Sequence, residues 1–185
     1  MVGTMQRYVA FLRGIAPSGT NMTNDKLRGV FEELGFAAVG SVLASGNITF
    51  RASEADVPFL EQTIEEALVS GLGVTSRTII RECSELRGLV DSDPFPGLTH
   101  QRRTYLTATF VKDASTVPDV LPGEAGRRTR VVRYDRVARA VLAVTDTSDP
   151  GEASGFMSWL EKTCGKDITT RSWLTVQRVV AKLES

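Results

Sequence analysis

Two hydrophobic periods alternate along the first eighty residues. Short apolar runs predict buried strands, and apolar residues at helical spacing predict amphipathic helices between them. The predicted strands cover residues 8–12, 37–43, 48–51 and 74–81. One helix carries its apolar face on Leu27, Val30, Phe31 and Leu34, and the next on Leu60, Ile64 and Leu68. The order β-α-β-β-α-β is that of the ferredoxin-like split unit.

Polar residues mark where the two helices begin and end. Thr23 can cap the first helix, and Gly35 can end it in a left-handed conformation. Either Ser53 or Asp56 can cap the second helix. These signals agree with the periodicity, so both helices are expected to form.

The second half of the chain looks like a looser copy of the first. A short helix is expected over 83–90, a half-buried strand over 105–111, and a hairpin from strands 130–134 and 139–145. A helix ending near Gly165, a strand over 168–171 and a last helix capped by Ser172 complete it. We therefore predict an α+β protein of two ferredoxin-like (βαββαβ) subdomains with antiparallel or mixed sheets, plus a C-terminal helix. The expected units are residues 1–84 and 85–185.

Composition narrows the class of partner. Hydrophobic residues make up 42% of the chain, which supports a buried core, and 22 basic residues balance 22 acidic ones. A neutral chain lacks the overall positive charge that attracts nucleic acid, so we do not expect a nucleic-acid partner. The basic group Arg127, Arg128, Arg130 and Arg133 is typical of a solvated face, although it could contact phosphates.

The cysteines and the N-terminus bear on location. Cys83 and Cys164 lie far apart without a pair spacing, so we interpret both as buried, reduced thiols. Residues 1–7 are polar and lack the apolar region of a secretory leader, and no apolar stretch is long enough to span a membrane. We expect a cytoplasmic protein with no membrane association.

Polar turn residues follow the first strand and also separate the second from the third. The first and second strands of such a sheet run parallel, so the end of the first and the turn after the second lie at the same end of the sheet. We call this end of the sheet the Arg13 edge. This edge collects the candidate ligand-binding residues Arg13, Gly14, Gly19, Asn21, Ser45, Gly46 and Asn47. Arg13 could donate two parallel hydrogen bonds to a phosphate or carboxylate, and the adjoining helix N-terminus attracts anions.

The same residues also have a structural interpretation. Gly and Asn tolerate positive φ, so Ser45-Gly46-Asn47 fits an ordinary hairpin turn. Arg13 could instead pair with a carboxylate such as Glu32 or Glu33, and Asn21 could cap the helix. Both interpretations stay open at this point.

Other chemistry-bearing residues are sparser. Arg171 is a secondary candidate for ligand binding, whereas Trp173 beside it fits a core position. His100 is the only histidine and is expected to be a solvated loop residue. No group of residues has zinc-ligand spacing, and no Walker or dinucleotide-binding glycine pattern occurs. We expect neither a metal nor a cofactor.

Several short segments of the chain resemble those of a known family. The run Tyr8-Val9-Ala10-Phe11-Leu12-Arg13-Gly14-Ile15, with Asn21-Met22, Leu27-Arg28, Leu34-Gly35-Phe36, Ser45-Gly46-Asn47 and Phe50, is similar to the bacterial family called domain of unknown function 1697. Asp93-Pro94-Phe95, Thr170-Arg171 and Thr175-Val176 resemble its middle and C-terminal signatures. The resemblance implies a two-part α+β protein and no particular activity.

Two positions depart from the family pattern. Ala16 and Ser172 each stand where the family usually has asparagine. If those amides bind a ligand in relatives, this chain binds it less well or differently.

Three functional hypotheses follow from the sequence. The chain is a binding module for a small anionic ligand, such as a nucleotide or phosphorylated metabolite; an enzyme of unknown reaction acting on such a ligand; or a structural or interaction protein with no ligand. The first half has no histidine for general-base catalysis, and its carboxylates near the candidate edge fit a solvated helix face.

Overall fold

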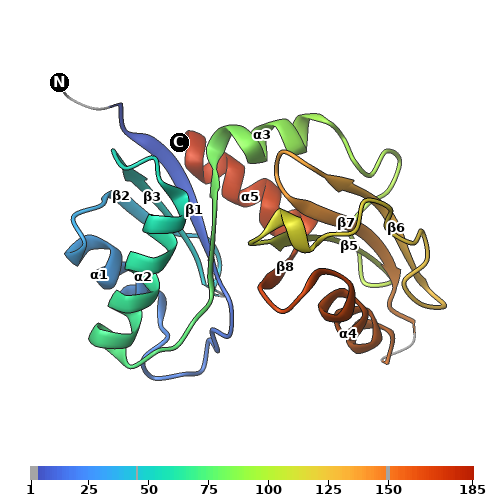
Figure 1. Ribbon diagram of the computed structural model, residues 1–185, viewed down its shortest axis with the longest axis horizontal. Helices are drawn as coiled ribbons and strands as arrows, with labels where there is room; N and C mark the ends of the chain where they lie inside the picture. Colours follow the sequence, from blue (N-terminus) through green and yellow to red (C-terminus); the bar gives the residue numbers. More distant parts are fainter. Residues whose placement is uncertain (1–3, 45, 149–150) are drawn as a thin grey trace. The chain divides into compact units, whose positions relative to one another are not determined.

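The computed structural model describes residues 4–44, 46–148 and 151–185 (Figure 1). Within them lie two four-stranded sheets, in both of which all neighbouring strands are antiparallel. The α+β class and the two ferredoxin-like subdomains predicted from the sequence are confirmed. None of the helices among these residues combines the length and apolar composition that a bilayer crossing needs.

The first sheet follows the predicted order of elements. These are β1 (Gln6–Leu12), α1 (Asn24–Glu33), β2 (Ala37–Ser41), β3 (Asn47–Ala52), α2 (Val57–Leu72) and β4 (Thr78–Glu82). The strand order across the sheet is β2-β3-β1-β4. The parallel course of β1 and β2, on which the candidate edge depends, is therefore present.

Local signals explain where the two helices begin. The Thr23 side chain accepts a hydrogen bond from the Lys26 N–H at 3.4 Å, and Asp56 accepts one from the Phe59 N–H at 3.1 Å. Asp56, and not Ser53, is thus the cap of α2. Gly35 and Gly73 have φ of +79° and +66° beyond the last turns, which is the left-handed conformation predicted for Gly35.

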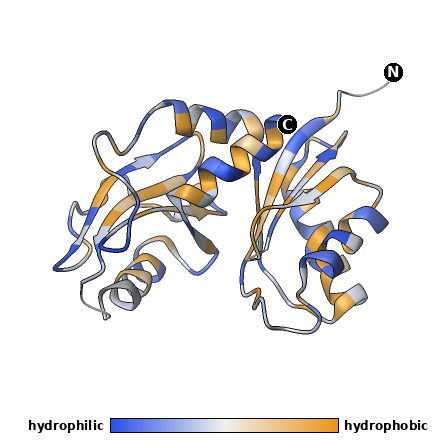
Figure 2. Cartoon of the chain, turned by 180° about the vertical axis from the view of Figure 1, so that it is seen from behind, coloured by the Kyte–Doolittle hydropathy of each residue, from blue (hydrophilic) through white to orange (hydrophobic). Residues whose placement is uncertain are grey.

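The core of the first subdomain lies between one face of its sheet and helices α1 and α2. Alternate residues of the strands meet the apolar stripes of the helices, and Figure 2 shows hydrophobic residues along the strands. Phe50 sits at the centre, stacked on Phe36 at 4.7 Å and edge-on to Phe31 at 5.4 Å between ring centroids. Aromatic pairs of this kind stabilise a core by more than their buried area alone.

Strand β4 begins later than the sequence pattern indicated. The predicted strand started at Val74, but the Val74 N–H donates to the Leu68 carbonyl at 3.1 Å, as part of the end of α2. That bond commits the first residues of the apolar run to the helix end. The β-branched run is therefore divided between a helix terminus and a strand, a distinction that periodicity does not make.

Carboxylates occupy the outer side of β4, which lies at the edge of the sheet. Glu65 and Glu61, one turn apart on α2, accept the backbone N–H groups of Thr78 at 2.8 Å and Ile80 at 2.9 Å. Glu85 accepts the Glu82 N–H at 2.7 Å. Glu61 is buried, so its bond satisfies a backbone donor that water does not reach.

The second sheet repeats the topology of the first. Its elements are α3 (Cys83–Asp91), β5 (Thr104–Val111), the short 3-10 helix η1 (Ala114–Thr116), β6 (Thr129–Asp135), β7 (Ala140–Asp146), α4 (Glu152–Cys164), β8 (Ile168–Ser172) and α5 (Trp173–Glu184). The order β6-β7-β5-β8 corresponds strand by strand to β2-β3-β1-β4. One helical turn, η1, stands where the first subdomain has α1, in agreement with the looser copy that the sequence predicts.

The second subdomain has its own apolar core and cap. Phe156, Leu160 and Cys164 of α4 pack with Val141 and Ala143 of β7. Ser172 caps α5 by accepting the Thr175 N–H at 3.3 Å, as predicted. Trp173 is buried and meets Phe95 edge-on at 5.3 Å, which confirms its core role.

The chain divides into two compact units. Met1–Leu86 and Arg178–Ser185 form one, and Arg87–Gln177 form the other. Helices α3 and α5 each contribute residues to both units. The boundary between residues 84 and 85 stays a prediction from the sequence.

Candidate functional site

The two segments singled out in the sequence lie together in the structure. Phe11 pairs with Asn47 across β1 and β3, and the Leu12 N–H donates to the Gly46 carbonyl at 2.8 Å. Gly46 has a φ of +70°, and a Cβ there would lie 2.8 Å from Ile15 Cγ1. Glycine is thus required at this position by both the backbone conformation and the close approach of Ile15. Ser45 lies outside the described residues.

Arg13 lies just beyond β1, at the surface. It is partly exposed, and its backbone bonds continue the pairing with β4: its N–H donates to the Arg77 carbonyl and its carbonyl accepts the Ser76 hydroxyl, both at 2.8 Å. Gly14 follows in the left-handed region with φ of +78° and open space where a side chain would stand. Backbone atoms at Gly14 are therefore accessible to a ligand.

Arg77 is a residue of this edge that the sequence analysis missed. The Arg13–Arg77 backbone bond places it opposite Arg13, one residue before β4. The signal was available in principle, because β4 antiparallel to β1 brings its first residues beside the end of β1. Two guanidinium-bearing residues from neighbouring strands thus share the edge.

Backbone hydrogen bonds form within the loop that precedes α1. The Gly19 N–H donates to the Ala16 carbonyl at 2.9 Å, and the Met22 N–H donates to the Gly19 carbonyl at 3.0 Å. The Ala16 N–H contacts the Met22 sulfur at 3.2 Å. These three N–H groups are engaged inside the loop, so they are not available to an anion.

The side chains of both predicted amides form hydrogen bonds to backbone carbonyls of the protein. Asn47 is 0% exposed and donates from Nδ2 to the Val42 carbonyl at 2.9 Å. Asn21 is exposed, donates to the Leu72 carbonyl at 3.1 Å and accepts from Lys26 Nζ at 3.0 Å. Asn21 is not the helix cap, a role that belongs to Thr23. Both amides thus bond within the protein, Asn47 in the buried hairpin and Asn21 at the surface.

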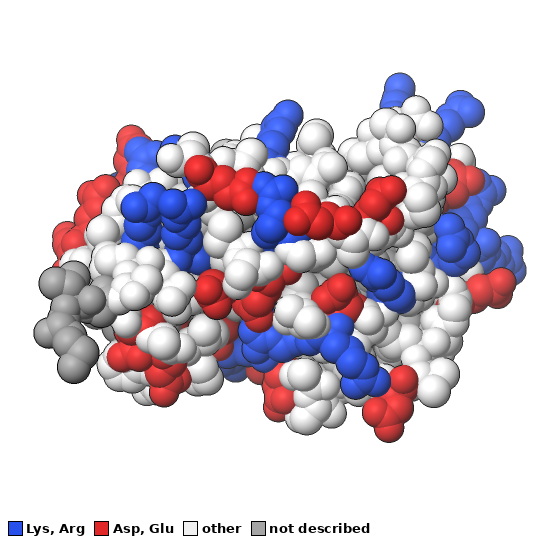
Figure 3. All heavy atoms as spheres, turned by 90° about the horizontal axis from the view of Figure 1, so that it is seen from above, with Lys and Arg blue, Asp and Glu red and all other residues white. Residues whose placement is uncertain are grey.

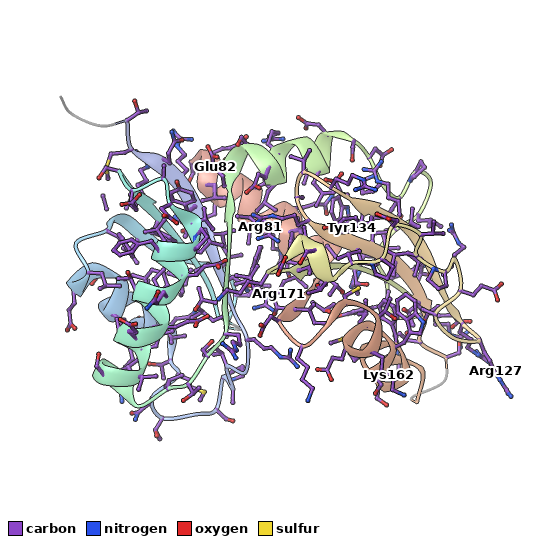
Figure 4. All side chains as sticks on the ribbon, in the orientation of Figure 1. Arg81, Glu82, Arg127, Tyr134, Lys162 and Arg171 are labelled. Carbon is purple, nitrogen blue, oxygen red and sulfur yellow. The ribbon has the colours of Figure 1, made fainter. Side chains whose placement is uncertain are left out.

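Arg171, the secondary candidate, lies apart from this edge in sequence and is held by its own strand. It donates from Nη1 to Thr169 Oγ1 at 2.7 Å and to the Thr170 carbonyl at 3.0 Å. Burial lowers the pKa of Arg171 to about 10, so the guanidinium stays charged at neutral pH. Figure 4 shows it on β8, and Arg81 on β4.

The remaining candidates take structural positions. His100 lies in its loop but is partly buried, and its Nδ1 accepts the Leu106 N–H at 3.2 Å, so the expectation of a merely solvated residue is corrected. Cys164 is buried, which raises the pKa of its thiol, whereas Cys83 is partly exposed, contrary to prediction. Within the described residues both cysteines are free, and no cluster of three or more His, Cys, Asp or Glu could hold a metal.

The basic group of the second subdomain lies at the surface. Arg127, Arg128, Arg130 and Arg133 are exposed, and Arg128 pairs with Asp146 at 3.5 Å. On the face shown in Figure 3, basic side chains lie close to acidic ones. A phosphate at Arg128 would therefore also meet the carboxylate of Asp146.

The chain shares its fold with a solved bacterial protein and belongs to a known family. The chain has the fold of the conserved bacterial protein SP0830 from Streptococcus pneumoniae, with a TM-score of 0.70 over 98% of this chain and 100% of that one, at 16% identity. Residues 5–137 match the family described as "Protein of unknown function (DUF1697)", and the chain belongs to that family. A comparison with curated proteins finds no match.

Proposed function

We propose that the protein is a binding module for a small anionic ligand, a nucleotide or phosphorylated metabolite, which binds at the edge of Arg13 and Gly14. The observation that carries the proposal is the partly exposed Arg13 beside the accessible backbone of Gly14. A guanidinium presents paired N–H donors to phosphate or carboxylate oxygens, and glycine lets the ligand approach the chain closely.

The surroundings supply further positive potential. Arg77 stands opposite Arg13, and Lys26 lies in the first turn of α1 with its ammonium on Asn21. The N-terminus of the ten-residue helix α1 adds a favourable field for an anion. Gly19 and Asn21 then shape the loop, and Gly46 and Asn47 shape the hairpin, beside which these charges lie.

A structural role without ligand is the second candidate, and Asn47 favours it. Its buried bond to the Val42 carbonyl fixes the hairpin whether or not anything binds. Under this alternative the family signatures maintain turns and the helix start. The two functions differ in what Arg13 contributes, because only the binding module needs its guanidinium for a ligand.

We further propose that the protein acts in the cytoplasm. The support is that Cys83 and Cys164, on different units, both carry free thiols. Unpaired cysteines are typical of proteins in reducing compartments.

A thermal-shift and calorimetric titration with inorganic phosphate, AMP and ATP tests ligand binding. Arg13→Ala should weaken the affinity for a bound probe by about 1.5–3 kcal/mol, the range of a charge-assisted bond. Arg13→Lys should recover part of it, because a point charge does not reproduce the fork. Arg127→Ala, which removes an exposed arginine of the other unit, is the matched control and should bind like the parent protein.

Asn47→Ala separates the two candidate functions. It should lower the melting temperature because a buried carbonyl loses its donor, while Arg13→Ala should leave the fold intact. If no probe binds, the structural function is the correct one; if Arg13→Ala binds every probe like the parent protein, the Arg13 edge is structural and the probe binds elsewhere. Conversion of a bound probe to product would show an enzyme.

A further inference from the structure

The first unit contains a cavity at the opposite end of β1 from Arg13. Its volume is about 350 Å³, and its polar lining comes from Arg7 on β1, Thr49 and Arg51 on β3, Lys182 near the end of α5, and Ser185 just after that helix. All of these residues belong to the unit formed by Met1–Leu86 and Arg178–Ser185. Arg7 precedes Arg13 by six residues, a span of about 20 Å along a strand.

Two of the cations face each other directly. Arg7 and Arg51 are register partners in the antiparallel pairing of β1 with β3, so both side chains leave the same face of the sheet. Neighbouring Tyr8 and Phe50 point to the opposite face, into the core. Like charges at directly opposite positions repel each other and destabilise a sheet.

Lys182, the third cation, lies over the same strands because Gly40 leaves room for its side chain. A Cβ at Gly40 would lie 3.1 Å from Lys182 Cε and 2.9 Å from Thr49 Oγ1. The absence of a side chain at Gly40 leaves the space that the Lys182 stem occupies. Lys182 thereby reaches the sheet face from which Arg7 and Arg51 project.

Contacts within the protein account for only one of these charges. Arg7 donates from Nη1 to the Leu183 carbonyl at 3.1 Å, which satisfies an acceptor at the end of α5. Within the part of the chain that the structure describes, Arg51 and Lys182 form no ion pair with a carboxylate. The bond to the end of α5 therefore explains why Arg7 lies at the cavity. It does not explain why Arg51 and Lys182 lie there too.

We propose that this cavity binds the phosphate group of a small phosphorylated metabolite. A phosphate oxygen between Arg7 and Arg51 would replace their repulsion with two charge-assisted hydrogen bonds. Lys182 supplies a third positive charge, and the Thr49 hydroxyl supplies a neutral donor. The volume exceeds that of phosphate alone and falls in the range of small-molecule pockets, so part of the attached group also fits. This site is independent of the one proposed at Arg13.

The test is calorimetric titration of the full chain with inorganic phosphate, glucose 6-phosphate and glucose, alongside melting curves. Arg51→Gln and Lys182→Gln should each raise the dissociation constant for glucose 6-phosphate at least about tenfold. Glucose itself should not bind. Without ligand, Arg51→Gln should melt at or above the temperature of the parent protein, because it removes a repulsive neighbour of Arg7.

Two results would overturn the proposal. One is unchanged binding of the phosphorylated probe in Arg51→Gln and Lys182→Gln, or no binding by the parent protein. The other is a lower melting temperature for Arg51→Gln together with indifference to phosphate, which would show that the cations only support the helix end. Arg13→Ala distinguishes the two sites: it should leave this affinity unchanged, and a loss in Arg13→Ala alone would assign the anion to the Arg13 edge.

Discussion

Strands β4 and β8 occupy the same place in their sheets, and they carry an arginine at the same position. Arg81 pairs with Val9 on β1, and Arg171 pairs with Ala108 on β5. Each donates from Nη1 to the carbonyl of the residue before it, at 2.6 Å and 3.0 Å. The repeat therefore extends from strand order to individual side-chain bonds.

The two arginines differ in their surroundings. Arg81 is 0% exposed, whereas Arg171 keeps partial exposure. The polar contacts along the two strands are also of different kinds: Glu61 and Glu65 accept backbone N–H groups of β4, and on β8 the Thr170 hydroxyl contacts the Met157 sulfur at 3.4 Å and the Thr109 hydroxyl of β5 at 2.8 Å. Equivalent strands thus carry an arginine at the same position among different polar contacts.

The largest expected effect is a difference between the two arginines. Arg81→Ala should lower the free energy of unfolding by about 2–5 kcal/mol, as for other large-to-small changes at enclosed positions. Arg171→Ala should cost about 1–2 kcal/mol, because water can replace part of what a partly exposed group loses. Urea unfolding followed by circular dichroism measures both. If both variants lose the same free energy of unfolding, burial does not decide how much each arginine contributes.

Glu61 tests the dependence of β4 on α2. Glu61→Ala should destabilise by about 1–3 kcal/mol because the Ile80 N–H loses its buried acceptor. Glu61→Gln keeps an acceptor oxygen and should recover most of the loss. Glu66→Ala, on the exposed side of the same helix, is the control and should stay within about 0.5 kcal/mol of the parent protein. A Glu61→Ala protein as stable as Glu66→Ala would show that the bond contributes nothing.

The free cysteines offer one probe in each unit. Iodoacetamide at pH 8 should modify Cys83 at least about tenfold faster than Cys164, because Cys164 is buried and its raised pKa lowers the thiolate fraction. Mass spectrometry of the digested protein at successive times gives both rates. In urea the two rates should converge. Faster modification of Cys164 in the native protein would mean that α4 opens readily.

The smallest effects are expected at two helical glycines, one in each subdomain. Gly29 of α1 and Gly155 of α4 have nothing within 4 Å of an added Cβ. Gly29→Ala and Gly155→Ala should each stabilise by about 0.5–1 kcal/mol, the difference in helix propensity. Thermal melts of both variants measure this. A destabilised Gly155→Ala would show that the space beside α4 is used.

Local chemistry made much of the fold predictable. Thr23 and Ser172 cap the helices that the sequence assigned to them, and Gly35 takes its left-handed conformation. Each depends on neighbours a few residues away, so sequence spacing contains the information. The division of the run after Gly73 between helix end and strand depends on a bond from Val74 to Leu68, and apolar composition does not encode that choice.

The candidate sites were predictable to different degrees. The convergence of Arg13 with Gly46 follows from strand direction, which the order of elements fixes. Arg77 required the register between β1 and β4, which side-chain packing decides. Lys182 meets Gly40 only through the packing of the last helical turn, and no pattern near residue 182 specifies that contact.

The carboxylates along β4 also limit how this protein can meet other chains. An open sheet edge is a template on which a foreign strand can add by backbone pairing, the route to both peptide capture and aggregation. Glu61, Glu65 and Glu85 already occupy the N–H groups that such a strand would need. At the other edge, β2 has a register shift between Ala37 and Gly40, with φ of +49° at Ala38, and irregular edges resist strand addition. A partner of the first sheet is therefore expected to recognise side chains, because both backbone edges resist strand addition.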